Sequence, residues 1–185
     1  MKFELIDRII ELSRGERIVA VKAVSLAEEY LADHFPTFPV LPGVLMLEAL
    51  VESAGWLVRD AQDFANTVIL LREAKNVTYK GFVKPGHLLT VTVTCRRLAQ
   101  GESEFDGVGH CNQNEVVRAR FGLTHFCLRD RLGAPEARDR RLEEAARLRF
   151  AQLQGMPGRL EADEGNGVPR FQGGAQPGER EIKAE

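Results

Sequence analysis

The sequence predicts an α+β domain in which an antiparallel sheet encloses one long buried helix. Residues 43–59 are apolar nearly all round, which is typical of a buried helix. Long segments rich in β-branched residues follow and are joined by tight turns, which is typical of an antiparallel sheet. A sheet wrapped around the helix is the simplest arrangement that buries the helix, so we expect that architecture.

Ahead of the helix, the sequence predicts a short element and one strand. Residues 3–12 alternate between apolar and charged residues and end at a Ser-Arg-Gly-Glu turn. Residues 17–24 have the β-branched pattern of a strand, and residues 26–33 are loop-like or briefly helical. Pro36, Pro39 and Pro42 then recur at every third residue and keep the chain extended up to the central helix.

Strand-like segments follow the helix. The clearest has Thr alternating with apolar residues, and the Lys84-Pro85-Gly86 turn precedes it. The segments span residues 67–72, 74–83, 88–95, 103–111 and 116–128. The strand that precedes the helix is expected to join the same sheet.

The composition changes near residue 130, which divides the chain into three predicted parts. Residues 1–130 are expected to form the folded domain. Residues 131–154 are rich in Arg, Glu and Ala and predict an amphipathic surface helix, whose narrow apolar stripe is Leu142, Ala146, Phe150 and Leu153. Residues 155–185 are rich in Gly, Pro and charge, which predicts a flexible or disordered tail.

Composition also excludes several classes of function. The formal net charge of −2 argues against nucleic-acid binding, and no apolar stretch is long enough to span a membrane. The charged N-terminus does not resemble a secretory signal. Three cysteines without a CxxC pair predict reduced thiols in a cytoplasmic protein, and the His and Cys spacings predict no metal site.

His34 and Glu48 are the candidate catalytic residues. Histidine titrates near neutral pH, so His34 can act as a general base. Glu48 lies in the apolar helix, where apolar neighbours are expected to raise the pKa of its carboxyl, as a general acid requires. Gly43 begins the helix, where unpaired backbone N–H groups can hold a developing negative charge.

The segment from His34 to Glu48 resembles the signature of the FabZ/FabA-type 3-hydroxyacyl-[acyl-carrier-protein] dehydratases. It contains His-Phe-Pro, then Phe-Pro, then Pro-Gly-Val-Leu, then Leu-Glu-Ala. The interval of 48 − 34 = 14 residues equals that of the family. Residues 77–86 resemble a second block of the family and Asp7-Arg8 resembles its opening, so the likeness covers about residues 3–128.

The resemblance implies a hot-dog fold, a curved antiparallel sheet around a central helix. It implies an enzyme that dehydrates (3R)-hydroxyacyl thioesters to trans-2-enoyl thioesters in fatty-acid or related lipid biosynthesis. The substrate would be carried on the phosphopantetheine of acyl carrier protein, with no other cofactor. His34 and Glu48 would meet across a homodimer interface, and dimers can assemble further into a trimer of dimers. Gly43 is the expected thioester-binding donor, and Val44 and Glu52 are further expected substrate contacts.

The sequence departs from the family pattern in ways that leave alternatives open. Asp33 and Thr37 replace glycines, and Glu52 replaces a glutamine one helical turn beyond Glu48. Two carboxylates at i and i+4 disfavour joint ionisation, so Glu52 either keeps Glu48 protonated or alters the site. The alternative functions are a hot-dog thioesterase, an enoyl-thioester hydratase of the MaoC type, and a catalytically altered acyl- or carrier-binding protein. MaoC-type hydratases usually place an aspartate a few residues before the histidine, whereas Asp33 is adjacent to His34.

Overall fold

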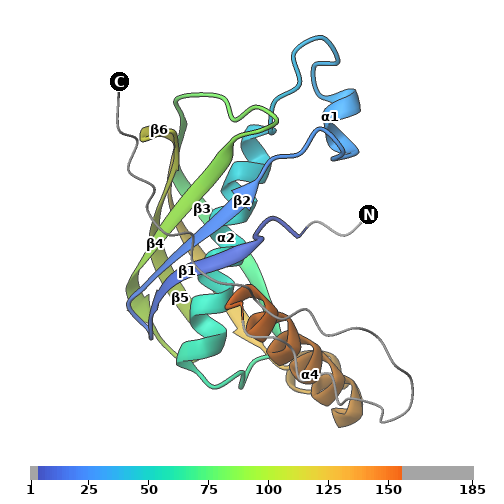
Figure 1. Cartoon of the computed structure of the whole chain (residues 1–185). Coiled ribbons are helices and arrows are strands. Elements are labelled where there is room, and N and C mark those ends of the chain that lie inside the picture. Colours follow the sequence, from blue (N-terminus) through green and yellow to red (C-terminus); the bar gives the residue numbers. More distant parts are fainter. Residues whose placement is uncertain (1–3, 156–185) are drawn as a thin grey trace, which may run out of the picture.

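The computed structural model describes residues 4–155 and contains one six-stranded antiparallel sheet in the order β1-β2-β4-β5-β6-β3 (Figure 1). The strands are β1 (Arg8–Ser13), β2 (Arg17–Ala23), β3 (Val68–Tyr79), β4 (Leu88–Leu98), β5 (Glu102–Cys111) and β6 (Asn114–Phe126). The strand that precedes the central helix pairs with β4, as the sequence predicts.

The long helix α2 (Gly43–Ala61) packs against this sheet and contacts strands β2 to β6. Its side chains Met46, Leu50 and Leu57 are fully buried there. A Cβ atom added to Gly107 on β5 would come within 3.0 to 3.1 Å of the Phe121 and Leu50 side chains, so this glycine permits close packing of helix on sheet. The predicted antiparallel sheet with one long central helix is confirmed.

Strand β3 is continuous where the sequence predicts two segments. Its pairing with β6 shifts register between Leu71 and Glu73 and again between Lys75 and Thr78. Asn76 lies in the second irregularity with a φ of 52°, a left-handed conformation that asparagine tolerates better than most residues. The predicted break is therefore a pair of bulge-like irregularities within one strand.

The C-terminal helix α4 (Glu136–Leu153) follows the short helix α3 (Leu128–Leu132) and packs on α2. The Phe150 ring stacks on Trp56 at a centroid distance of 5.9 Å and meets Phe64 edge-on at 5.5 Å. Phe150 and Leu153 belong to the hydrophobic core, which the surface-helix prediction did not anticipate. Their end of the helix covers α2, whereas Leu142 at the other end remains 40% exposed.

Within residues 4–155, none of the helices has the length and apolar character that a membrane crossing requires. Of the predicted tail, residues 156–185 lie outside the described part of the chain.

Candidate active site

His34 follows the one-turn helix α1 (Tyr30–Asp33), in a segment that projects from the body of the domain (Figure 1). The His34 backbone N–H donates a hydrogen bond to the Tyr30 carbonyl at 3.1 Å. His34 itself has extended backbone angles, and no helix forms between it and Pro42. This agrees with the proline spacing, because each proline removes a backbone donor and restricts the residue before it.

Phe35 holds a strained backbone conformation directly beside His34. Its φ of 55° lies in the left-handed region, which is unusual for an aromatic residue. Its carbonyl accepts a hydrogen bond from the Phe38 N–H at 2.7 Å, and its ring centroid lies 4.4 Å from that of His34. Such conformations cost about 1–3 kcal/mol and cluster at functional sites, so the strain favours a functional role for this turn.

A cleft of about 360 Å³ lies beside His34 and reaches the start of α2. Pro42, which precedes the first residue of α2, forms part of its wall. The lining residues are Glu29, Tyr30, Asp33, His34 and Pro42. Glu29 and Tyr30 were not predicted as site residues, although the i, i+4 spacing of residues 30 and 34 across a helical turn is a signal that points to Tyr30.

The start of α2 presents backbone N–H groups without intrahelical acceptors. The Pro42 carbonyl accepts hydrogen bonds from Leu45 at 2.9 Å and Met46 at 3.2 Å, which are the first of the helix. Within residues 4–155, the N–H groups of Gly43 and Val44 donate to no acceptor. The helix dipole favours negative charge at this end, so the two groups can stabilise an oxyanion.

Gly43 also lies close to the Tyr79 ring of strand β3. A Cβ atom at this position would lie 3.2 Å from the Tyr79 ring. Burial raises the pKa of the Tyr79 hydroxyl, so the residue is neutral at ordinary pH. A glycine at the start of α2 therefore leaves room both for the Tyr79 ring and for a ligand at the N–H group.

Glu48 is exposed in the single chain, which corrects the expectation that apolar residues surround it on all sides. Leu50 and Val51 on the same helix are buried, but Val44 is 67% exposed and shares a helix face with Glu48 at i, i+4. Partial burial nevertheless raises the pKa of the Glu48 carboxyl, in the predicted direction. Glu48 does not line the cleft beside His34, so within residues 4–155 this cleft does not bring the two residues together.

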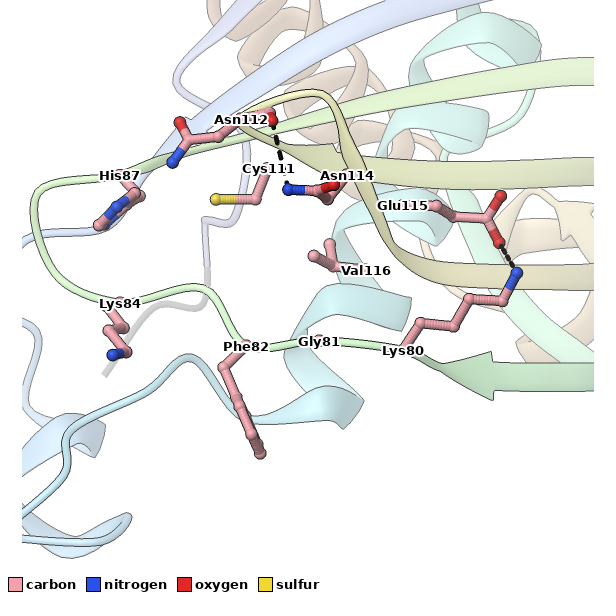
Figure 2. A pocket seen from close by; sticks show the side chains of 10 residues that line it. All are labelled: Lys80, Gly81, Phe82, Lys84, His87, Cys111, Asn112, Asn114, Glu115 and Val116. Atoms are coloured by element: carbon pink, nitrogen blue, oxygen red, sulfur yellow. Dashed lines mark hydrogen bonds and ion pairs between the residues drawn. The ribbon is translucent and has the colours of Figure 1, made fainter.

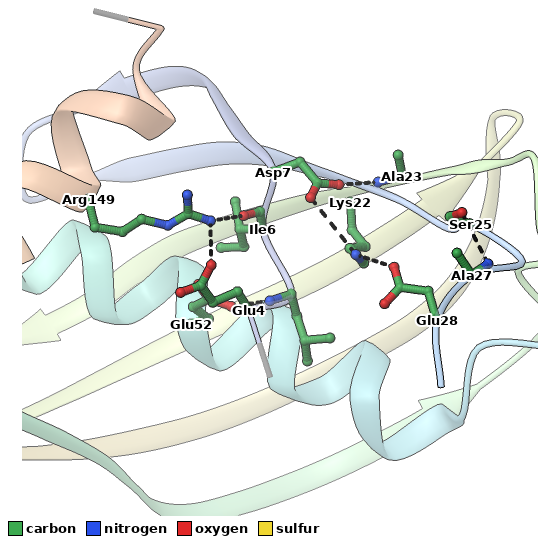
Figure 3. A network of polar contacts seen from close by, with 11 residues as sticks. Glu4, Ile6, Asp7, Lys22, Ala23, Ser25, Ala27, Glu28, Glu52 and Arg149 are labelled. Atoms are coloured by element: carbon green, nitrogen blue, oxygen red, sulfur yellow. Dashed lines mark hydrogen bonds and ion pairs between the residues drawn. The ribbon is translucent and has the colours of Figure 1, made fainter. Parts of the chain in front are cut away.

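Glu52 is engaged away from the cleft. Its carboxylate accepts a hydrogen bond from the Leu5 backbone N–H at 2.7 Å (Figure 3). It also accepts a longer one from the Trp56 indole at 3.4 Å. Burial raises the pKa of this carboxyl, while these bonds and the positive charge of Arg149 lower it. These contacts fix the N-terminal segment on α2, and the two predicted roles of Glu52, substrate binding and tuning of Glu48, stay predictions.

A second and larger groove, of about 430 Å³, lies between the β3–β4 loop and the β5–β6 hairpin (Figure 2). It contains neither His34 nor Glu48, but its loop touches the His34 segment. The Lys84 ammonium lies 4.6 Å from the centroid of the Phe38 ring, and the Phe38 and Phe82 rings meet edge-on at 5.8 Å. The Leu41 N–H also donates to the Val83 carbonyl at 2.8 Å, so this loop supports the segment between His34 and α2.

The three cysteines, Cys95, Cys111 and Cys127, are free thiols. Among residues 4–155, no group of three or more His, Cys, Asp or Glu side chains is arranged to hold a metal ion.

Comparison with known proteins identifies the family. A family model described as a FabA-like domain matches residues 1–120. The 3-hydroxyacyl-[acyl-carrier-protein] dehydratase FabZ of Paracidovorax citrulli is 38% identical over 125 residues, which cover 66% of this chain and 86% of that protein. The protein of the same name from Caldanaerobacter subterraneus subsp. tengcongensis is 37% identical over 119 residues, covering 64% of this chain and 84% of that protein.

Solved structures show the same hot-dog fold at low sequence identity. A chain of the ApeI:P dehydratase heterocomplex of Xenorhabdus doucetiae superposes with a TM-score of 0.56 at 18% identity, covering 66% of this chain and 83% of that one. The smu.793 protein of Streptococcus mutans, solved with acetyl CoA, gives a TM-score of 0.51 at 14% identity, covering 69% of this chain and 93% of that one. Sequence and fold together show that this chain belongs to the FabA-like family of hot-dog dehydratases, with the FabZ 3-hydroxyacyl-[acyl-carrier-protein] dehydratases among its relatives.

Proposed function

We propose that this chain removes water from (3R)-hydroxyacyl thioesters carried on acyl carrier protein and releases trans-2-enoyl thioesters, in fatty-acid or related lipid biosynthesis. The observation that carries the proposal is the cleft in which His34 lies beside the open N-terminus of α2. A base next to an oxyanion-binding helix start is what proton removal from a thioester requires.

The first half of the proposed reaction uses His34 and Gly43. The neutral imidazole of His34 takes the proton from C2 of the acyl chain. The electrons of that C–H bond move toward the thioester carbonyl, whose oxygen becomes enolate-like. The N–H of Gly43 donates to this oxygen, and the dipole of the 19-residue helix α2 adds to its stabilisation.

The second half uses Glu48 as the acid. The C3–O bond breaks as the Glu48 carboxyl gives its proton to the departing hydroxyl, and water leaves. The raised pKa of Glu48 keeps a larger fraction of the acid form near neutral pH. The His34 proton afterwards returns to Glu48 or to solvent. The elimination is redox-neutral, so we propose that it needs no cofactor beyond the phosphopantetheine that carries the substrate.

We propose that the working site forms between two copies of the chain. Glu48 is exposed and absent from the His34 cleft, so a second copy can bring its Glu48 to that cleft. Val44 on the same helix face is exposed, as are Leu70, Leu71 and Tyr79 on the edge strand β3. An exposed apolar edge strand is a common pairing surface. Burying it in a homodimer prevents the strand from pairing with other chains and aggregating. A trimer of dimers and a cytoplasmic location stay predictions.

The reaction can be tested with purified protein and 3-hydroxyacyl chains of several lengths on acyl carrier protein, by following enoyl absorbance. We expect turnover by the wild type and losses of at least about 100-fold in His34→Ala and Glu48→Gln. A folded wild type without turnover at every chain length would refute the proposal.

The shared site can be tested by subunit mixing. When inactive His34→Ala and Glu48→Gln chains are unfolded together and refolded, about half of the dimers contain one chain of each kind. In such a dimer one site combines both mutations and the other has an intact His34 and an intact Glu48. Activity of about a quarter of the wild type is therefore expected. Mixtures that stay inactive would show that each chain supplies both residues of its own site.

A further inference from the structure

Residues 25–40, which carry His34, are weakly tied to the other elements of the described chain. Between residues 25 and 40, the backbone hydrogen bonds join neighbours within the segment, such as the Leu31 N–H to the Glu28 carbonyl at 3.0 Å. Within residues 4–155, the single hydrogen bond from this segment to another element runs from the Lys22 ammonium on β2 to the Glu28 carboxylate at 2.6 Å. The Lys22–Glu28 pair therefore attaches the start of this projecting segment, whereas the Leu41 N–H bond to the Val83 carbonyl and the Lys84 contact with Phe38 hold its other end (Figure 1).

The attachment point on β2 is itself rigid. The Lys22 side chain is 7% exposed, and the Asp7 carboxylate lies 3.9 Å from its ammonium on the side opposite Glu28 (Figure 3). Asp7 accepts a hydrogen bond from the Ala23 N–H at 2.6 Å, and its own N–H donates to the Val21 carbonyl at 2.9 Å. A buried ammonium has a strong penalty for losing its partners, so Lys22 holds Glu28 in a fixed place.

Tyr30 connects this ion pair to His34. Its hydroxyl is buried without a hydrogen-bond partner within residues 4–155, and its carbonyl accepts the His34 N–H. Burial raises the pKa of Tyr30 to about 12, with a further contribution from the negative charges of Glu28 and then Asp7. The ring is therefore neutral and packed near the ion pair, so a movement of Glu28 would be transmitted along α1 to His34.

We propose that Glu28 and Lys22 are positioning residues for His34: their partly buried ion pair fixes the projecting segment so that the imidazole faces the open start of α2. The inference rests on the proposed function, in which His34 removes the C2 proton. Neither residue touches the reacting atoms. Their effect is on geometry, and a displacement of about 1 Å can lower a catalytic rate by about 100-fold.

The decisive variant is Glu28→Ala, and Glu11→Ala is its matched control. Glu11 forms an ion pair of similar length, 2.9 Å, with Arg17 on the same strand as Lys22, but that pair is exposed and distant in sequence from the site. We expect Glu28→Ala to lower kcat by about 10- to 100-fold with KM changed by less than about threefold. Glu11→Ala should leave both unchanged. Glu28→Gln keeps an acceptor for the Lys22 ammonium and should recover part of kcat.

A second measurement observes His34 directly. Its ring signals in NMR spectra can be assigned by their loss in His34→Ala. They should shift and broaden in Glu28→Ala and stay in place in Glu11→Ala. If Glu28→Ala does not fold, Glu28→Gln and Lys22→Met carry the same comparison.

Two results would overturn the inference. One is a Glu28→Ala enzyme with kcat within twofold of the wild type. The other is a loss of activity that follows the unfolded fraction while the His34 signals of the folded protein do not move. A wild type without any turnover would instead refute the proposed function, and the NMR comparison would still decide whether Glu28 positions His34.

Discussion

Replacing Phe150 with alanine should detach the end of α4 from the domain. Phe150 is 9% exposed, stacks on Trp56 and meets Phe64 edge-on, so its ring joins α4 to α2 and to the segment that follows α2. Truncation removes both aromatic contacts and leaves a cavity over the Trp56 ring. The resulting loss in the free energy of unfolding measures how strongly the packing of the C-terminal helix stabilises the domain.

The expected loss of stability follows from the burial of the Phe150 side chain. Phe→Ala at a buried position costs about 3–5 kcal/mol, and a site at the edge of the core can relax, so we expect about 3 kcal/mol here. For a domain of this size, about 1 kcal/mol lowers the midpoint of thermal unfolding by roughly 2–4 °C. Phe150→Ala should therefore unfold about 6–12 °C below the wild type.

The matched control is Leu148→Ala, on the same helix and 55% exposed. It should change the free energy of unfolding by less than about 0.5 kcal/mol. Thermal unfolding followed by circular dichroism gives the comparison, and fluorescence adds a local probe because Trp56 is the single tryptophan of the chain. Its emission should shift to longer wavelength in Phe150→Ala alone. Equal midpoints for the two variants, with unchanged emission, would show that α4 does not pack on α2.

Three further predictions concern single residues. Glu52→Gln should gain stability relative to the wild type as pH rises above about 4.5. Burial raises the folded-state pKa of Glu52 above that ordinary value, so the wild-type protein loses stability as its folded form gives up the proton. Thermal midpoints at several pH values check this, and a constant difference would contradict it. Asp139→Asn should be less stable than the wild type at pH 7, and the difference in their free energies of unfolding should narrow as pH falls below about 3.8. The pKa of Asp139 is lowered by hydrogen bonds from Thr67 and from the amides of Leu128 and Arg129, so its stabilisation is lost on protonation; a gap independent of pH would count against it. Gly43→Ala should lower kcat by about 10- to 100-fold with a small change in stability, since the added methyl meets the half-exposed Tyr79 ring and obstructs the N–H group proposed to hold the thioester oxygen. A kcat equal to that of the wild type would remove this N–H group from the mechanism.

The fold was predictable where apolar residues repeat over long segments. The helix expected over residues 43–59 spans Gly43–Ala61, and the strand expected over residues 88–95 spans Leu88–Leu98. Strand β3 was predicted less well because its irregular pairing depends on its partner β6, which lies about 50 residues away in the sequence. Local pattern carries no information about such register shifts.

The candidate site was predictable only in part. Spacing and residue type single out His34, Gly43 and Glu48, and the structure places His34 beside the start of α2. The pattern also predicts that Glu48 is enclosed, which is wrong for a single chain. A helix that is apolar all round predicts that each of its faces is buried. The pattern does not show whether a face packs on the sheet of the same chain or on another subunit. Val44 and Glu48 lie on the face that the chain itself leaves open.

Glu52 illustrates why a departure from a family pattern has to be interpreted in three dimensions. Three donors or cations surround its carboxylate: the Leu5 N–H, the Trp56 indole and the guanidinium of Arg149. A glutamine would have to turn its NH₂ group, itself a donor, toward one of them, whereas a carboxylate accepts from all. Arg149 lies on α4, beyond residues 1–120 that match the family model, and it also pairs with Glu4 at 3.2 Å. The glutamate at position 52 is therefore best explained by the extra helix and the N-terminal segment that it helps to hold.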